Sequence, residues 1–206
     1  MLARKLLALS GAGIVALVAL VVAVLGPDTP ANDASGASIA AYYHDHQAKS
    51  VAAAFVIGLT APLLIAFATR FVDGRRSASE LFFVVGSGLV AAAFLMTAAV
   101  QFALADVPNK LPGDALQALN VLANDTWAAW NPALGVMMLG AAATLRRREK
   151  SLHVLGSIAA VIGVVLFIPF ADFFALLATG LWLIGASVVL YRKMAEPRYA
   201  AQPQVA

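Results

Sequence analysis

The side chains best suited to chemistry lie in one short stretch, Tyr42-Tyr43-His44-Asp45-His46, which precedes a long apolar segment. Imidazole suits zinc and copper, so His44, His46 and the carboxylate of Asp45 are candidate metal ligands. Residues two apart point to different faces of a helix, so both imidazoles converge on one ion only in an extended or irregular segment. A solvated segment at a membrane interface is the simpler interpretation, and the metal site is the alternative.

A second set of polar residues lies near the ends of apolar segments in the second half of the chain. Polar groups within a bilayer are costly and usually face a protein interior or a water-filled cavity. We therefore predict an outward-facing polar pocket with two tryptophans as walls. Its candidate residues are Gln101, Asn120, Asn124, Asp125, Trp127, Trp130, Asn131 and Asp172. Helix capping and interfacial hydrogen bonding are the alternative for the same residues.

Neither set is accompanied by a pattern typical of an enzyme. The chain has no cysteine, which excludes thiolate metal sites and cysteine nucleophiles. Ser87, between two glycines, has no histidine in an apolar segment to activate it. None of the three histidines lies where it could hold haem within a bundle, and no glycine-rich phosphate loop is present. We therefore predict a non-enzymatic protein without a cofactor.

The composition predicts an all-helical membrane protein. The 206 residues are 62% hydrophobic and only 12% charged, whereas soluble domains carry about 25% charged residues. At about 1.5 Å per residue, roughly 20 apolar residues cross a hydrocarbon core of about 30 Å. Six segments are expected to do so: 6–25, 51–71, 81–104, 127–145, 152–168 and 173–191. The last two are divided at Ile168-Pro169-Phe170-Ala171-Asp172, where a proline and a carboxylate predict a turn.

The basic residues lie at the ends of these segments, so the pI of about 9.5 does not indicate a nucleic-acid partner. Positive residues are retained on the cytoplasmic side of a membrane. Lys49 and Lys110 lie on one side, and the rest of the 14 lie on the other: Arg4, Lys5, Arg70, Arg75, Arg76, Arg146, Arg147, Arg148, Lys150, Arg192, Lys193 and Arg198. We predict a multi-pass plasma-membrane protein with both termini in the cytoplasm. The basic loops are also expected to contact anionic lipid headgroups.

Residues 1–196 are expected to form one transmembrane domain, and residues 197–206 a disordered cytoplasmic tail. The first segment is expected to be an uncleaved anchor. Its apolar run exceeds the roughly 7–15 residues of a signal peptide and ends in a poor cleavage site, Val24-Leu25-Gly26-Pro27.

Two spacings predict local structure between and within these segments. Ala115, Leu119 and Leu122 recur at helical spacing and predict an amphipathic helix at the outer surface, leading into the fourth segment. In the fifth segment, Gly156 and Gly163 belong to a stripe of small residues that would let another helix approach closely.

The second half of the chain also contains several short motifs: Ala118-Leu119-Asn120, Asn124-Asp125-Thr126-Trp127, Asn131-Pro132, the basic loop Arg146–Lys150, Leu155-Gly156, Phe167-Ile168-Pro169-Phe170 and Gly180-Leu181-Trp182. On these motifs the chain resembles a group of uncharacterised integral membrane proteins that are common in high-GC Gram-positive bacteria. The resemblance implies a six-span architecture and supplies no activity and no catalytic residue.

Three functions follow from these observations. The leading hypothesis is a non-enzymatic membrane protein that binds a lipid, a small molecule or a partner through its outer polar face. The second is a small transporter or permease that acts as a homo-oligomer, because six helices alone rarely enclose a translocation path. The third is a membrane metalloprotein that uses His44 and His46.

Overall fold

The computed structural model describes residues 7–25, 29–72, 77–106, 110–148 and 150–195, and no strand occurs among them. In chain order its helices are α2 (Ser10–Leu20), the π-helix η1 (Val21–Leu25), α3 (Gly36–Asp45), α4 (Gln47–Ala68), η2 (Thr69–Phe71), α5 (Ala78–Asp106), α6 (Gly113–Asp125), α7 (Trp127–Arg146), η3 (Lys150–Leu152), α8 (His153–Val165) and α9 (Asp172–Ala195). The predicted all-helical class is confirmed. The predictions for Arg4, Lys5, Arg75, Arg76, Arg198 and the tail 197–206 lie outside the described residues.

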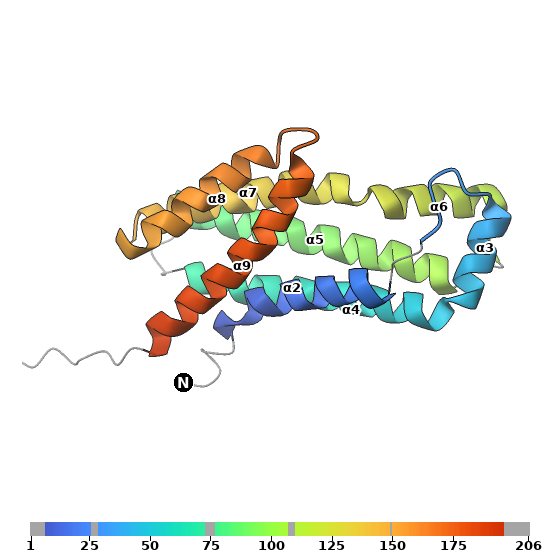
Figure 1. Ribbon diagram of the computed structural model, residues 1–206, viewed down its shortest axis with the longest axis horizontal. Helices are drawn as coiled ribbons and strands as arrows, with labels where there is room; N and C mark the ends of the chain where they lie inside the picture. Colours follow the sequence, from blue (N-terminus) through green and yellow to red (C-terminus); the bar gives the residue numbers. More distant parts are fainter. Residues whose placement is uncertain (1–6, 26–28, 73–76, 107–109, 149, 196–206) are drawn as a thin grey trace, which may run out of the picture.

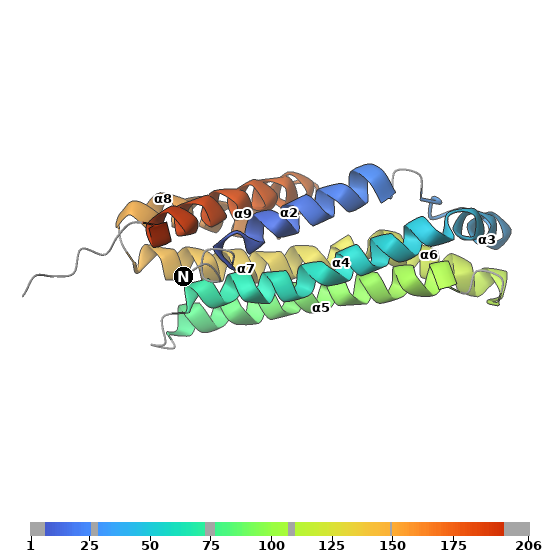
Figure 2. The same ribbon diagram turned by 90° about the horizontal axis from the view of Figure 1, so that it is seen from below.

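The long helices form an elongated bundle in which successive helices run in opposite directions along the long axis (Figure 1). α4, α5 and α7 pack side by side, and α2, α8 and α9 form a second layer against them (Figure 2). α2 begins and α9 ends toward the same end of the bundle, whereas α3 lies across the opposite end, beside α6 (Figure 1).

Among the residues that the structure describes, four helical stretches are long and apolar enough to cross a bilayer: Gln47–Phe71, Ala78–Asp106, Gly113–Arg146 and Asp172–Lys193. They contain the second, third, fourth and sixth predicted segments. The first and fifth predicted segments contain shorter apolar helices, Ser10–Ala23 and His153–Val165.

The fifth helix ends earlier than predicted. α8 ends at Val165 rather than at residue 168, and the chain then turns before α9 begins at Asp172. The turn is the one predicted around Pro169, which lacks the N–H that would continue the helix. Phe170 at the tip of the turn has a positive φ of 70° and is 95% exposed.

α6 is the amphipathic helix predicted ahead of the fourth segment, but the predicted face is wrong by one residue. The structure buries Leu116, Asn120 and Ala123, whereas Leu122 is 46% exposed. The prediction considered apolar positions only. Asn120 can occupy the buried face because its side chain makes the hydrogen bonds described below.

α5 and α7 approach each other closely through two glycines. A Cβ on Gly86 of α5 would lie 2.4 Å from the backbone nitrogen of Met137, and a Cβ on Gly140 of α7 would lie 2.4 Å from that of Phe83. Small residues at such crossings let two helix backbones come together, as is typical of helices packed in membranes. Gly163 of the predicted small-residue stripe likewise packs α8 against α7.

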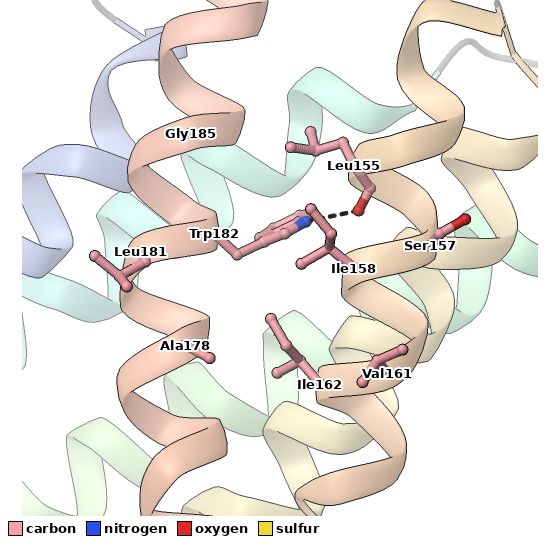
Figure 3. A pocket seen from close by; sticks show the side chains of 9 residues that line it. All are labelled: Leu155, Ser157, Ile158, Val161, Ile162, Ala178, Leu181, Trp182 and Gly185. Carbon is pink, nitrogen blue, oxygen red and sulfur yellow. Dashed lines mark hydrogen bonds between the residues drawn. The ribbon is translucent and has the colours of Figure 1, made fainter.

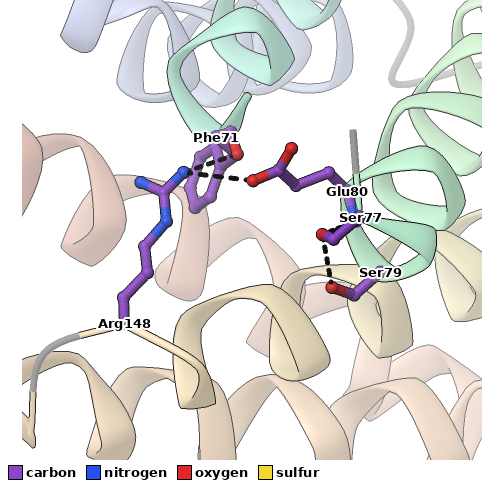
Figure 4. A network of polar contacts seen from close by, with 5 residues as sticks. All are labelled: Phe71, Ser77, Ser79, Glu80 and Arg148. Carbon is purple, nitrogen blue, oxygen red and sulfur yellow. Dashed lines mark hydrogen bonds and ion pairs between the residues drawn. The ribbon is translucent and has the colours of Figure 1, made fainter. Parts of the chain in front are cut away.

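An ion pair joins the ends of α4, α5 and α7 at the end of the bundle opposite α3 (Figure 4). Nη2 of Arg148 donates a hydrogen bond of 2.6 Å to the carbonyl oxygen of Phe71 and lies 4.0 Å from Oε1 of Glu80. Glu80 is buried at the start of α5, where a charged carboxylate needs a cationic partner. The pair therefore ties three segments that are distant in sequence.

Candidate functional site

A cap covers the end of the bundle near α3, and we define it as residues 29–34 together with α3 and α6. It has its own small hydrophobic core, made of Ile39, Tyr43, Leu104, Ala105, Leu116 and Ala123. α3 and α6 meet at their first residues, where a Cβ on Gly36 would lie 2.4 Å from Cα of Gly113. The two helices thus meet backbone to backbone, with no side chain between them.

Two asparagines of α6 hold residues 29–34 in place. Nδ2 of Asn120, which is fully buried, donates to the carbonyl oxygens of Pro30 and Ala31 at 3.1 and 3.0 Å. Nδ2 of Asn124 donates to the same Pro30 oxygen at 3.0 Å and to Oδ1 of Asn32 at 2.8 Å. Because residues four apart share a face of a helix, both amides point at the same loop. They therefore fix the position of the loop relative to α6.

A pocket of about 160 Å³ adjoins the cap. Its walls come from η1, the loop before α3, and helices α3, α4 and α5: Val21, Val22, Thr29, Tyr42, Tyr43, Ser50, Ala53, Ile57 and Gln101. The polar side chains among them are four hydroxyls and one amide, all uncharged, which both donate and accept hydrogen bonds. The volume is below the roughly 300–1,000 Å³ of pockets for drug-sized ligands, so the pocket suits a small neutral molecule.

Tyr43 and Tyr42 form the aromatic wall of this pocket. Their rings meet edge to face with centroids 5.2 Å apart, and the ring of His46 stacks on Tyr42 at 4.5 Å. Burial, and to a lesser extent the neighbouring Tyr42, raises the pKa of Tyr43 to about 12. The Tyr43 phenol is therefore neutral near pH 7 and can donate a hydrogen bond.

Tyr43→Phe is expected to make stability less sensitive to alkali. Since the folded-state pKa of about 12 exceeds the ordinary value of 10.0, the folded protein keeps the Tyr43 proton where the unfolded chain loses it. The contribution of the neutral Tyr43 phenol to the free energy of unfolding is complete below the unfolded-state pKa. It is lost as pH rises through the folded-state pKa, which lowers the free energy of unfolding by up to roughly 3 kcal/mol. Thermal unfolding in micelles, followed from about pH 8 to about pH 12, measures the difference between the two proteins. A difference that stays constant over this range contradicts the prediction.

The structure distributes the eight predicted pocket residues over separate places. Gln101 lines the pocket. Asn120 and Asn124 bind the loop of the cap, and Oδ1 of Asp125 accepts a long hydrogen bond of 3.4 Å from Nδ2 of Asn32. These three residues of α6 therefore position the cap.

The other four lie further along the bundle. Nδ2 of Asn131 donates to Oδ2 of Asp172 at 2.7 Å and joins α7 to the start of α9. Nε1 of Trp130 donates to Oγ1 of Thr97 at 3.1 Å, whereas Trp127 is 48% exposed. The helical rise from Asp125, the last of the three α6 residues at the cap, to Asn131 is about 9 Å. Their hydrogen bonds join helices of the bundle.

The candidate metal ligands lie at the junction of α3 and α4. His44 and Asp45 are exposed at the end of α3, and Nδ1 of His46 lies 2.9 Å from the carbonyl oxygen of Tyr42. His44 and Asp45 lie in the helix 36–45 rather than in an extended segment, whereas His46 lies at the irregular junction between α3 and α4. In the part of the chain that the structure describes, no three His, Cys, Asp or Glu side chains gather as ligands of one ion. The metal site stays a prediction without geometric support.

Sequence reasoning missed most of the pocket lining. Thr29 and Ser50 are single small hydroxyl residues at the edges of apolar segments, where no spacing distinguishes them. Tyr42 and Tyr43 stand out in the sequence only as neighbours of His44 and His46. The available signal was the spacing of Ile39 and Tyr43, which are four apart and therefore share one buried face of a helix.

No protein-family model matches the chain, and comparisons with curated proteins and with solved structures give no match either. The functional interpretation therefore depends on the geometry of the cap and the pocket. The resemblance to uncharacterised six-span bacterial proteins stays a prediction.

Proposed function

We propose that the protein is an integral plasma-membrane protein that crosses the bilayer six times, with both termini in the cytoplasm. The four long apolar stretches and the two shorter apolar helices support this proposal, since each follows its predecessor in the opposite direction (Figure 1). The basic residues support the orientation. Arg70, Arg192 and residues 146–148 lie at helix ends away from the cap, whereas Lys49 and Lys110 lie beside it. Positive residues mark the cytoplasmic side.

The cap would then stand outside the cell. The stretch Gly113–Arg146 has 34 residues, which at about 1.5 Å per residue makes about 51 Å, compared with about 30 Å for a hydrocarbon core. With its basic end at the inner surface, its first turns project well beyond the outer one. α6 and the helix packed against it, α3, are therefore accessible to solutes outside the cell.

We further propose that the protein binds a small, neutral, polar molecule in the pocket beside the cap and catalyses no reaction on it. The observation that carries this function is the set of uncharged hydroxyl and amide side chains that four chain segments bring to one pocket. Hydrogen-bonding groups that converge in a preformed pocket select a ligand by its own donors and acceptors. The asparagine contacts of the cap support it, because they fix the loop that contributes Thr29.

The test is a thermal-shift and equilibrium-binding screen of the protein in nanodiscs with acetamide, glycerol and erythritol as probes. A probe that binds the wild type is expected to bind Gln101→Leu and Ser50→Val about tenfold more weakly, since each change removes a hydrogen bond. Gln117→Leu, on α6 and outside the pocket lining, is the matched control and should bind as the wild type does. Equal affinity of Gln101→Leu and the wild type contradicts the site.

Native mass spectrometry of the protein released from nanodiscs separates this function from transport. A single subunit that keeps a non-lipid mass agrees with the proposal. A stable dimer that also carries the probe across the bilayer of a sealed vesicle supports the homo-oligomeric transporter instead.

A further inference from the structure

A larger, apolar groove of about 590 Å³ opens between α8 and α9 (Figure 3). Aliphatic side chains of both helices form its walls, and Figure 3 shows Ile158 and Ile162 facing Ala178 and Trp182 across it. Nε1 of Trp182 donates to the carbonyl oxygen of Leu155 at 2.9 Å. The indole N–H is thus satisfied within the protein, and the groove presents hydrocarbon to its occupant.

The floor of the groove is the Trp182 ring, which is packed against aromatic side chains of the bundle. Trp182 is 3% exposed, and its ring stacks on Phe71 at 6.3 Å and meets Phe67 edge-on at 6.4 Å. Gly185 keeps the upper part open, since a Cβ at this position would meet no atom within 4 Å. Because Phe71 and Phe67 hold the Trp182 ring in place, the ring does not move into the groove.

One basic side chain lies at one end of the groove. Nη2 of Arg146 donates to Oγ of Ser157 at 3.2 Å, but the Ser157 side chain points away from α9 (Figure 3), so this guanidinium is not at the groove. On α9, Arg192 follows Gly185 by seven residues and Gly185 follows Ala178 by seven, so these three residues share a face. The groove therefore combines hydrocarbon walls with a cation at one end. This arrangement is complementary to an amphiphile with an anionic head.

We propose that the groove between α8 and α9 binds an acyl chain of an anionic phospholipid from the cytoplasmic leaflet, with the lipid phosphate at Arg192. The inference rests on the membrane insertion proposed above and is independent of the pocket beside the cap. An acyl chain that enters the groove moves from the hydrocarbon of the bilayer to the hydrocarbon walls of the protein. Its burial therefore favours no lipid over another, and the selectivity among lipids comes from contacts with the headgroup. A basic residue near an anionic leaflet favours binding by about fivefold.

The test is the quenching of Trp182 fluorescence by phospholipids brominated on their acyl chains. Trp182 is made the sole tryptophan by Trp127→Phe and Trp130→Phe, and the protein is reconstituted in phosphatidylcholine vesicles. Brominated phosphatidylglycerol is expected to associate at least about fivefold more tightly than brominated phosphatidylcholine. Arg192→Gln is expected to reduce this preference about fivefold, whereas Lys110→Gln, beside the cap, leaves it unchanged.

Two glycine variants provide the matched steric control. Gly185→Leu fills the groove and is expected to abolish the preference. Gly58→Leu fills a second apolar groove of about 320 Å³ between α4 and α5, none of whose lining residues is charged, and should leave the preference intact. A Cβ on Gly58 meets only Cβ of Ala98, at 3.7 Å, so both positions accept a side chain without a backbone clash.

Equal association of the two brominated lipids, or a preference that survives Gly185→Leu, overturns the proposal. If the double tryptophan variant fails to fold, native mass spectrometry of the wild type provides the same comparison. It reports whether the protein retains phosphatidylglycerol in preference to phosphatidylcholine. Flotation with the vesicles is checked first, so a failure of membrane insertion is seen separately. A protein that floats, shows no quenching and forms a dimer that Gly185→Leu dissociates contains a second copy in the groove, which also overturns the proposal.

Discussion

Gly86→Ala is expected to lower the free energy of unfolding by about 3 kcal/mol, whereas Gly88→Ala, two residues along the same helix, raises it by up to about 1 kcal/mol. The new methyl group at Gly86 would lie 2.4 Å from a backbone nitrogen of α7, and a backbone cannot move aside as a flexible side chain can. A Cβ at Gly88 meets nothing within 4 Å, so alanine there only removes the conformational freedom of glycine. Thermal unfolding in detergent micelles, followed by tryptophan fluorescence, measures both.

The opposite signs make this pair informative. Both variants change the helix propensity of α5 in the same direction, so a difference between them reports the contact with α7. Gly140→Ala, whose Cβ would lie 2.4 Å from the backbone of Phe83, should behave as Gly86→Ala does. If Gly86→Ala and Gly88→Ala shift the melting temperature equally, the close crossing of α5 and α7 does not exist.

Asn120→Asp is expected to release the loop of the cap. The change replaces an NH₂ group that donates to two carbonyl oxygens by an oxygen that faces them at about the same distance. The loss of two hydrogen bonds and the burial of an unpaired charge together cost about 3 kcal/mol or more. Amide hydrogen exchange of Ala34, whose N–H donates to the carbonyl oxygen of Ala31, should accelerate by roughly a hundredfold, because each 1.4 kcal/mol is a factor of ten in the opening equilibrium.

The control for charge is Gln117→Glu, on the same helix and only partly buried, which should leave exchange of the Ala34 amide nearly unchanged. Asn120→Ala removes the donors without adding a charge and should give an intermediate rate. The orientation of the Asn120 amide is decided by its acceptors, since only the nitrogen can face two carbonyl oxygens. Protection that is the same in Asn120→Asp and the wild type would contradict this role for Asn120.

Much of the fold could be predicted because it follows from apolar run length. The segments 51–71, 81–104, 127–145 and 173–191 each lie within helical structure, and the turn around Pro169 follows from the missing proline N–H. Hydropathy does not determine where a helix ends within apolar sequence. α8 therefore ends before its predicted boundary.

The candidate site was less predictable, because its residues come from segments that are distant in sequence. Gln101 was identified as a polar residue near a membrane surface, but its pocket neighbours Thr29 and Ser50 were not. Asn120 and Asn124 are predicted as polar residues of the outward-facing pocket, whereas their side chains bond a loop about ninety residues away. The pairing of a buried amide with carbonyls depends on the tertiary arrangement, and no spacing along α6 encodes it.

The near-continuity of α6 and α7 gives the protein a mechanical link between its two ends. Thr126 keeps helical dihedral angles between them (φ −59°, ψ −25°), so the stretch Gly113–Arg146 behaves as one rod. Pro132 interrupts the hydrogen bonding of this stretch at one point and permits a bend there. Asn120, which holds the loop of the cap, and Arg148, which pairs with Glu80, therefore lie near the two ends of one nearly continuous helical stretch.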